Sequence, residues 1–259
     1  MERVAFVGAG KLAFHLAPAL KSAGLQISQV YSRTEAAAQR LAQRVDAIPL
    51  TQLSELDLSV DLVIIAVADD AIGAVAASLG SLVDPVSSPL VVHTSGGTPT
   101  ALLGAHFPRY GSFYPLQTFT FDFEPDFSTI PFCLYSPNVE DLKFLEGIAS
   151  RLSDRIYELD DQQRQTLHVS AVFVNNFVNA LYRGAYQLME EDRIPLELLE
   201  PLMRVTLEKA LEDHPQEVQT GPAVRGDQKT IDRHLARLEP NADLTNIYAI
   251  LTDFIQNRK

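Results

Sequence analysis

A glycine-rich segment near the start of the chain has the spacing of a turn that binds nucleotide phosphates. Its sequence, Gly8-Ala9-Gly10-Lys11-Leu12-Ala13, fits the pattern G-x-G-x-x-(G/A). The first glycine permits a tight turn, the second lets a pyrophosphate approach the backbone, and the small third residue lets a helix pack on a strand. The helix N-terminus also offers unpaired N–H groups. The residues expected to hold a dinucleotide are Gly8, Ala9, Gly10, Lys11 and Leu12. The alternative is a plain structural turn.

The residues that follow the next strand bear on which dinucleotide binds. NAD-dependent enzymes usually place Asp or Glu about 20 residues past the glycine motif, where the carboxylate binds the ribose hydroxyls. This chain has Tyr31-Ser32-Arg33-Thr34 instead, with no acid before Glu35. A guanidinium and two hydroxyls suit the 2′-phosphate of NADP, because Arg pairs directly with phosphate oxygens. Ser32, Arg33 and Thr34 therefore predict NADP in preference to NAD, unless Arg33 is only a solvated surface residue.

A second polar segment, His93-Thr94-Ser95-Gly96-Gly97, follows an apolar run that is typical of a buried strand. Ligands of open α/β sheets gather beyond the carboxyl ends of the strands. Ser95 and the two glycines can offer a hydroxyl and backbone N–H groups to a substrate carboxylate. A flexible turn whose Ser or Thr caps the next helix is an equally good alternative. We interpret His93 as a loop histidine rather than a catalyst.

A long helix is predicted over residues 165–189, which contain no proline and one glycine. At ~100° per residue, Asn175 and Asn179 each lie within about 20° of His168 around the helix axis. The apolar residues of this helix include Val169, Val172, Phe173 and Phe177, so we expect it to be largely buried. Because buried polar groups need partners, the polar stripe is predicted to face a cleft. Bonding to the backbone of a neighbouring domain is the alternative.

The segment 220–227, Thr-Gly-Pro-Ala-Val-Arg-Gly-Asp, is predicted to be a compact loop that opens a helix. Asp227 is its expected N-cap, because a carboxylate there can accept from the unpaired N–H groups of the first turn. Arg225 can hold a substrate anion or tie the loop to the fold, and we favour the structural role.

Alternating strands and helices must position these residues. Strands are predicted at 4–7, 27–31, 62–67 and 90–92, and helices at 11–23 and 35–45, with a kink at Pro18. The apolar runs without alternation indicate strands covered on both faces. Residues 111–132 are expected to form a long ordered loop or edge strands near a cleft. A helix at 139–152 and a strand at 155–159 then complete an α/β domain over residues 1–159 with a parallel sheet.

The character of the chain changes after residue 159. Besides the long helix, helices are predicted at 196–211, 227–238 and 246–255, and no strand is expected. The sequence therefore predicts a second, all-α domain over residues 160–259, which is within the normal size range of a domain.

The overall composition excludes several classes of protein. Of 259 residues, 46% are hydrophobic and 21% are charged, as in soluble globular proteins. The net charge of −12 disfavours nucleic acid and anionic membranes as partners. The single cysteine, Cys133, excludes an intramolecular disulfide and a multi-cysteine metal site, and we expect it to be a buried strand thiol. No metal site, signal peptide or membrane span is expected. We therefore expect a reduced, cytoplasmic protein with a small-molecule partner.

Taken in order, these motifs resemble a family of proteins assigned as NADP-dependent oxidoreductases. Its members pair a Rossmann-like N-terminal domain with a helical C-terminal domain of unknown function. The motifs that carry the resemblance are the turn at 8–13, Ala66-Val67 with Asp69-Asp70-Ala71-Ile72, His93-Thr94-Ser95-Gly96, Tyr114-Pro115-Leu116-Gln117-Thr118-Phe119, the helix at 175–181 and the loop at 220–227. More distantly, the layout is similar to the 6-phosphogluconate dehydrogenase superfamily, which includes pyrroline-5-carboxylate reductases and prephenate dehydrogenases.

The resemblance implies a nicotinamide bound where the two domains meet, and a homodimer formed by the helical domain. It places Ala66 and Val67 on the ribose and nicotinamide side, and Ser95-Gly96-Gly97 against the substrate. The hydroxyacid dehydrogenases of this superfamily have a catalytic lysine. It has no match here, because the predicted long helix contains no Lys. His168 is the nearest titratable residue. Close relatives often have His before the Pro-Leu of the middle motif, where this chain has Tyr114.

We therefore expect an NADP-dependent oxidoreductase that transfers hydride to or from a C=O or C=N group of a small acidic metabolite. His168 is the expected acid/base, since a histidine titrates near neutral pH. Asn175 and Ser95 are expected to orient the substrate. The missing lysine favours an alternative, a non-catalytic NADP-binding sensor or partner module. A dimeric scaffold with a degenerate cofactor site is a third and weaker interpretation.

Overall fold

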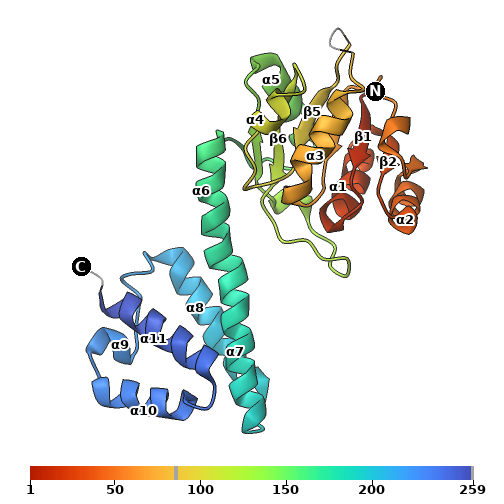
Figure 1. Cartoon of the computed structure of the whole chain (residues 1–259). Helices are drawn as coiled ribbons and strands as arrows, with labels where there is room; N and C mark the ends of the chain where they lie inside the picture. Colours follow the sequence, from red (N-terminus) through yellow and green to blue (C-terminus); the bar gives the residue numbers. More distant parts are fainter. Residues whose placement is uncertain (85–86, 258–259) are drawn as a thin grey trace. The chain divides into compact units, whose positions relative to one another are not determined.

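The first part of the chain builds an eight-stranded sheet in the order β3-β2-β1-β4-β5-β6-β7-β8 (Figure 1). The structure, a computed structural model, describes residues 1–84 and 87–257. The strands are β1 (Arg3–Val7), β2 (Gln26–Tyr31), β3 (Ile48–Leu50), β4 (Leu62–Ile65), β5 (Leu90–His93), β6 (Tyr110–Pro115), β7 (Phe132–Tyr135) and β8 (Ile156–Glu158). All neighbours pair in parallel except β6 and β7. The strands from β1 to β6 therefore bring their carboxyl ends to one edge of the sheet.

Helices cover both faces of this sheet. Helices α1 (Lys11–Ser22), α2 (Glu35–Val45) and α5 (Val139–Ala149) share one apolar core, and α3 (Asp69–Gly80) and α4 (Ala101–Gly104) share the other. In β1, Val4 and Phe6 join the first core, whereas Ala5 and Val7 join the second. Because both faces are covered, no polar alternation is needed, which explains the uninterrupted apolar runs in the sequence. The predicted α/β class with a Rossmann-like sheet is confirmed.

The segment predicted to be irregular, 111–132, contributes a strand inside the sheet. Strand β6 lies between β5 and β7, and the loop after it includes a 3-10 turn at Phe127–Thr129. Aromatic residues of this loop, Phe119 and Phe127, pack against the first core. Cys133 of β7 is buried, as expected, and burial raises the pKa of its thiol to about 11.

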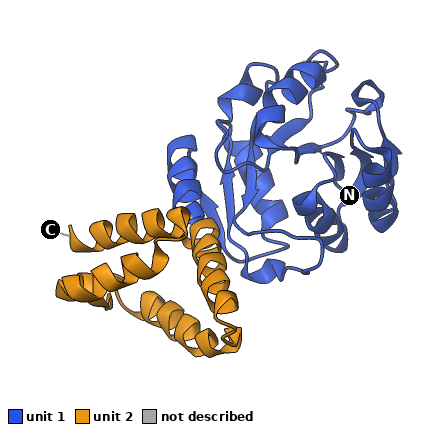
Figure 2. Ribbon diagram, turned by 60° about the horizontal axis from the view of Figure 1, so that its bottom comes forward, with its two compact units in different colours: residues 1–172 blue, residues 173–259 orange. Residues whose placement is uncertain are grey.

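Contacts within the chain define two compact units, Met1–Val172 and Phe173–Lys259, coloured separately in Figure 2. This division follows helix α6 (Asp161–Ala171) rather than preceding it. The carboxylate of Asp161 accepts hydrogen bonds from the backbone N–H of Thr100, at 2.9 Å, and from its hydroxyl. Arg164, which is fully buried, pairs with Asp161 and donates to the hydroxyl of Ser112 at 3.0 Å. These bonds attach α6 to the first unit.

The second unit is entirely helical in the part that the structure describes. Its helices are α7 (Val178–Glu191), α8 (Glu200–Glu212), α9 (Pro222–Arg225), α10 (Gln228–Leu238) and α11 (Ala242–Gln256). As predicted, Asp227 caps α10, with its side chain accepting from the backbone N–H of Thr230 at 3.2 Å. Few large side chains are buried in this unit, among them Ile231 and Leu238.

The long helix predicted over 165–189 differs from expectation in two ways. A π-helical stretch, Val172–Phe177, joins α6 to α7. In a π-helix each residue turns by less than the ~100° of an α-helix, so the predicted stripe of His168, Asn175 and Asn179 does not hold. Nor is the helix largely buried, because Phe173 is 61% exposed and Phe177 is 50% exposed. Its apolar residues lack enough partners within this chain.

Candidate functional site

Four loops with candidate residues leave the carboxyl edge of the sheet next to one another. They follow β1 (8–10), β2 (32–34), β4 (66–68) and β5 (94–97), and these strands are neighbours in the order β2-β1-β4-β5. Strand order therefore brings together residues that lie up to 89 positions apart in the sequence, from Gly8 to Gly97.

The turn after β1 is built so that only glycine fits its first position. Gly8 has φ +114°, and its N–H donates to the backbone carbonyl of Tyr31 at 2.8 Å. A Cβ at Gly8 would lie 2.2 Å from the carbonyl oxygen of Ala66. The loops after β1 and β4 are therefore in backbone contact, which a side chain would prevent.

Gly10 differs from Gly8, because no other part of the described chain occupies the space that its side chain would take. It is the N-cap of α1, and no protein atom lies within 4 Å of a Cβ built on it. The first helical hydrogen bond runs from Phe14 to Gly10, so the N–H groups of the first turn have no partner inside the helix. This open cradle of N–H groups fits a pyrophosphate.

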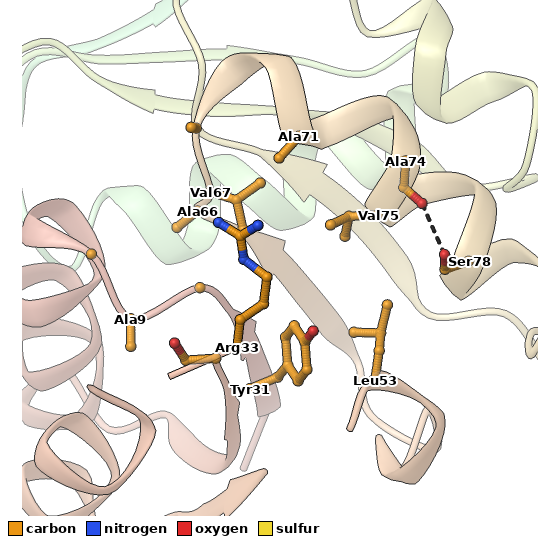
Figure 3. A pocket seen from close by; sticks show the side chains of 14 residues that line it. Ala9, Tyr31, Arg33, Leu53, Ala66, Val67, Ala71, Ala74, Val75 and Ser78 are labelled. Atoms are coloured by element: carbon orange, nitrogen blue, oxygen red, sulfur yellow. Dashed lines mark hydrogen bonds between the residues drawn. The ribbon is translucent and has the colours of Figure 1, made fainter. Parts of the chain in front are cut away.

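A pocket of about 530 Å³ opens beside the glycine turn (Figure 3). Arg33 and Tyr31 come from the end of β2, whereas Ala71, Ala74 and Val75 come from α3. The pocket is lined by Gly8, Ala9, Gly10, Tyr31, Ser32, Arg33, Leu53, Ala66, Val67, Ala68, Ala71, Ala74, Val75 and Ser78. It therefore combines an apolar wall with a guanidinium, as an adenine ring and a ribose phosphate require.

A smaller pocket of about 310 Å³ continues along the same edge of the sheet. It shares Gly10 and the segment 66–68 with the first pocket. Its other lining residues are Lys11, Leu12, Asp69, Thr94 and Ser95. All the residues predicted to bind the cofactor line one of the two pockets, except Thr34. Thr34 is the N-cap of α2, and its N–H donates to the Ser32 hydroxyl at 3.2 Å.

The side chain of Ser95 is engaged within its own loop. Its oxygen accepts from the N–H groups of Gly97, at 3.2 Å, and Thr98, at 3.0 Å, and it lies 2.9 Å from the Thr98 hydroxyl. A serine hydroxyl has one donor and two acceptor positions, so these contacts fill its capacity. These contacts shape the loop, and the expected role of Ser95 in orienting substrate stays a prediction, since Ser95 also lines the smaller pocket. Within the described part of the chain, the Gly96 N–H is left without a hydrogen-bond partner.

His168 lies directly against the two glycines of this loop. A Cβ at Gly96 would lie 2.5 Å from His168 Nδ1, and one at Gly97 would lie 3.9 Å from Nε2. The Gly97 position is also 3.6 Å from a carboxylate oxygen of Asp69, which lines the smaller pocket. His168 does not itself line either pocket, but it lies against the loop that contributes Thr94 and Ser95 to the smaller one.

Tyr114, at the end of β6, is a site residue that sequence reasoning did not select. Its hydroxyl lies 3.3 Å from His168 Nδ1, and the two rings meet edge to face. Burial, with smaller contributions from Cys133 and Asp69, raises the pKa of Tyr114 to about 12. The signal in the sequence was the tyrosine before Pro-Leu in the middle motif.

His93 ends strand β5 and is fully buried rather than part of a loop. Its Nδ1 accepts from the N–H of Ser95 at 3.2 Å, so the ring helps to shape the glycine loop. Burial, helped by the charge of Arg164, lowers the pKa of His93 to about 3. A histidine that stays neutral and enclosed does not serve as an acid/base, which agrees with the non-catalytic interpretation.

Two other candidate residues belong to the second unit. Asn175 lies in the π-helical stretch, and Arg225 is exposed at the end of α9. Neither lines the two pockets described above. The expected contact of Asn175 with substrate and the structural role favoured for Arg225 remain predictions.

No group of three or more His, Cys, Asp or Glu side chains among the described residues is arranged to hold a metal ion. None of the helices described is both long enough and apolar enough to cross a membrane.

Two family profiles match the chain. A Rossmann-like domain matches residues 2–112, and a domain of unknown function, DUF2520, matches residues 130–255. A search of curated proteins finds no match to the chain.

Solved structures similar to this chain cover nearly its whole length. A Bacteroides fragilis protein, provisionally assigned as an NADP oxidoreductase, is 39% identical, with 99% of this chain and 98% of that chain covered and a TM-score of 0.91. A Thermotoga maritima protein is 22% identical over 98% of both chains, with a TM-score of 0.77. An imine reductase from Myxococcus stipitatus, solved with NADP⁺, is 18% identical over 98% of this chain and 91% of that chain, with a TM-score of 0.67. The last two similarities show the fold alone.

Proposed function

Since this chain belongs to the family that joins a Rossmann-like domain to a DUF2520 domain, we propose that it is an NADP-dependent oxidoreductase. Its substrate is a small acidic metabolite with a C=O or C=N group. The carrying observation is the continuity of the site: Arg33 follows β2, the glycine cradle follows the neighbouring β1, and His168 lies against the loop after β5 at the same edge of the sheet. The full-length relative at 39% identity supports the oxidoreductase class.

Different residues of the first unit bind different parts of the cofactor. Gly8, Ala9 and Gly10 bring their backbone to the pyrophosphate, with Lys11 and Leu12 at the start of α1. Ser32 and Arg33 bind the 2′-phosphate, and Ala66 and Val67 line the ribose and nicotinamide side. Arg33 favours NADP, because a charge-assisted, bidentate pair with phosphate is about twice as strong as a neutral hydrogen bond. Thr34 contributes through the shape of the loop.

When bound, the cofactor supplies or accepts the hydride, and the protein must handle the proton. His168 donates a proton to the substrate oxygen or nitrogen during reduction and accepts it during oxidation. The unpaired N–H of Gly96 offers a hydrogen bond to a substrate carboxylate or to the developing negative charge. Asn175 is retained as a substrate-orienting residue from the second unit.

We expect the second unit to form a homodimer. Helices α8 and α11 have no buried residue, although they carry large apolar side chains such as Leu202, Leu211 and Ile250. Apolar surface on this scale is typical of a surface covered by a partner. A second copy of the chain would cover this apolar surface. The enzyme would act in the cytoplasm, where its single thiol stays reduced.

The first test is a titration of the purified protein with NADPH and NADH, followed by nicotinamide fluorescence. We expect NADPH to bind at least tenfold more tightly. The NADPH-loaded protein is then screened with keto acids and imino acids for loss of absorbance at the nicotinamide band. Turnover that His168→Gln reduces by 100-fold or more supports the proposal, since general acid catalysis contributes about 10²–10⁴-fold.

Other outcomes of this test would change the assignment. Tight NADPH binding without turnover of any metabolite favours the non-catalytic sensor or partner module. The absence of a catalytic lysine from the long helix supports the same alternative. Absence of binding to either dinucleotide overturns the enzyme assignment and leaves a scaffold with the Rossmann shape.

A further inference from the structure

The contact between Tyr114 and His168 joins two elements that are distant in the sequence. Tyr114 comes from β6 and His168 from α6, and the hydroxyl oxygen lies 3.3 Å from Nδ1. Gly96 makes this approach possible, because a Cβ there would lie 2.5 Å from Nδ1 and 2.8 Å from Cζ of Tyr114. The loop, the strand and the helix therefore meet at one point.

This contact is not needed to hold the helix in place. Helix α6 is already attached through Asp161 and Arg164, which lie in its first two turns and bond to Thr100, Thr98 and Ser112. Arg164 is fully buried, so its bonds are shielded from water. The Tyr114 contact thus has a more specific effect, which is to engage one of the two ring nitrogens of His168.

The two nitrogens of His168 have different surroundings. Nδ1 faces the Tyr114 hydroxyl, whereas Nε2 lies 3.9 Å from the position of a Cβ on Gly97, a position that is itself 3.6 Å from Asp69 of the smaller pocket. In a neutral imidazole, the hydrogen bond made by one nitrogen determines which nitrogen carries the proton. A partner at Nδ1 therefore decides what Nε2 can do.

The charged and titratable groups around Tyr114 keep it neutral. Burial raises its pKa to about 12, and Cys133 of β7 and Asp69 of α3 act in the same direction, against a smaller opposing effect of Arg164 of α6. A neutral phenol has an oxygen that can accept a hydrogen bond, and it adds no charge. It is also a poor final source of protons, so His168 remains the group that exchanges them.

On the basis of the proposed function, we propose that Tyr114 is a positioning residue for His168, its hydroxyl oxygen accepting a hydrogen bond from Nδ1–H so that Nε2 faces the reacting group. During reduction the Nε2–H bond of the imidazolium breaks, and that proton passes to the substrate oxygen or nitrogen while the substrate carbon gains hydride. His168 is left neutral with its proton on Nδ1. During oxidation the free electron pair on Nε2 takes the proton back.

The neutral partner suits an acid/base that must work in both directions. A carboxylate at Nδ1 would stabilise the imidazolium by charge and so hold the proton. A phenol fixes the orientation of the ring, as the third member of a catalytic triad does, without this stabilisation. The same geometry then serves proton donation and proton acceptance.

The position of the proton can be measured without any substrate. Long-range ¹H–¹⁵N correlation spectra of the whole protein distinguish Nδ1–H from Nε2–H in neutral histidines, and His168→Gln identifies the signals of His168. We expect the Nδ1–H form in the wild-type protein at a pH where the ring is neutral. In Tyr114→Phe, the population should shift toward the Nε2–H form. Tyr110→Phe, the same change on the same strand, is the matched control and should leave the spectrum unchanged.

The wild-type spectrum alone can overturn the inference. A proton on Nε2 would mean that Tyr114 donates to Nδ1, and the positioning role as stated would be wrong. The same conclusion follows if Tyr114→Phe leaves the His168 signals unchanged. Because these spectra need neither cofactor nor turnover, they separate this inference from the proposed function.

Kinetics on an identified substrate give the second measurement. Tyr114→Phe should lower kcat about tenfold or more through loss of ring orientation, with the affinity for NADPH unchanged. An unchanged kcat would contradict the inference even if the proton is found on Nδ1.

Discussion

The guanidinium of Arg164, in helix α6, donates a hydrogen bond to the backbone carbonyl of Thr98, in the loop after strand β5. Arg164 and His168 are four residues apart on the same helix, so they lie on one face. The bond therefore fixes the helix that carries the proposed acid/base to the loop that contains Gly96. His168, Tyr114 and Gly96 all belong to the first unit.

The two glycines of the cradle should respond differently to the same substitution. Gly8→Ala places a methyl group 2.2 Å from the Ala66 carbonyl oxygen at φ +114°. We expect it to destabilise the first unit by about 2–5 kcal/mol through strain and steric clash. Gly10→Ala meets open space, so the folded state should be unaffected while NADPH binding falls at least tenfold. Urea unfolding and fluorescence titration measure the two effects. Equal loss of stability in both variants would contradict the assignment of the cradle.

Arg33 should determine the choice between the two dinucleotides. Arg33→Asp removes a hydrogen bond between charged groups, worth about 1.5–3 kcal/mol, and puts a negative charge near the 2′-phosphate. NADPH affinity should fall 10- to 100-fold or more, whereas NADH affinity should stay constant or rise. Lys143→Asp makes the same change of charge at an exposed position of α5 and serves as control. If Arg33→Asp keeps its preference for NADPH, the assignment is withdrawn.

Gly96 and Gly97 form another matched pair. A Cβ at Gly96 collides with His168 Nδ1 at 2.5 Å, whereas one at Gly97 makes ordinary contacts of 3.5 Å or more. Gly96→Ala should cost about 1–3 kcal/mol of stability and displace the His168 ring. Gly97→Ala should keep the stability within about 0.5 kcal/mol of the wild type but lower kcat, because the methyl group enters the site. Unfolding and turnover of both variants, compared side by side, test this.

The buried His93 should make the protein less stable in acid. Its pKa of about 3 in the folded state lies below the value of about 6.5 in an unfolded chain. Between these values the unfolded chain binds a proton that the folded protein does not, so stability falls as the pH drops from about 6.5 to 3. The slope contributed by this one group is up to about 1.4 kcal/mol per pH unit.

Replacing this histidine should therefore flatten the pH dependence of stability. We expect His93→Gln to remove roughly 2–3 kcal/mol from the difference in unfolding free energy between pH 7.5 and pH 4.5. His106→Gln, an exposed histidine in the same unit, is the control and should change little. Parallel pH curves for His93→Gln and the wild type would show that His93 titrates normally in the folded protein.

The dimer can be tested on helix α8, where Leu207 and Leu211 lie one turn apart and are 60% and 77% exposed. The double variant Leu207→Glu, Leu211→Glu should halve the mass measured by sedimentation, because charges are costly in a desolvated apolar interface. Ile48→Glu, at a 61% exposed position in the first unit, should leave the mass unchanged. A wild-type protein that sediments as a monomer at micromolar concentration contradicts the proposed dimer.

Local patterns in the sequence were sufficient to predict most of the fold. Helix α2 was predicted with the bounds observed, because its apolar spacing begins after Thr34 and ends before Asp46, which has φ +53°. Asp227 was recognised as an N-cap for the same kind of reason. Helix caps and apolar spacing depend on residues a few positions apart, so they can be read without the tertiary structure.

The site was only partly predictable, since its contacts depend on the order of strands. Tyr114 and His168 are 54 residues apart, so no local sequence pattern indicates their hydrogen bond. Arg164 was not selected from the sequence, because no local pattern indicates its buried contacts with Thr98 and Ser112. The π-helical stretch also escaped notice, because periodicity at ~100° per residue assumes that every turn is α-helical.

Cys133 has a consequence that concerns measurement. It lies opposite Tyr114 in the β6–β7 ladder, it is buried, and its pKa of about 11 leaves almost no thiolate at neutral pH. Alkylating reagents attack thiolates, so the folded protein should be nearly inert to them until these strands separate. With one thiol in 259 residues, each labelled molecule reports a single opening event at that place. The rate of labelling therefore measures how often strand β6, which carries Tyr114, separates from strand β7.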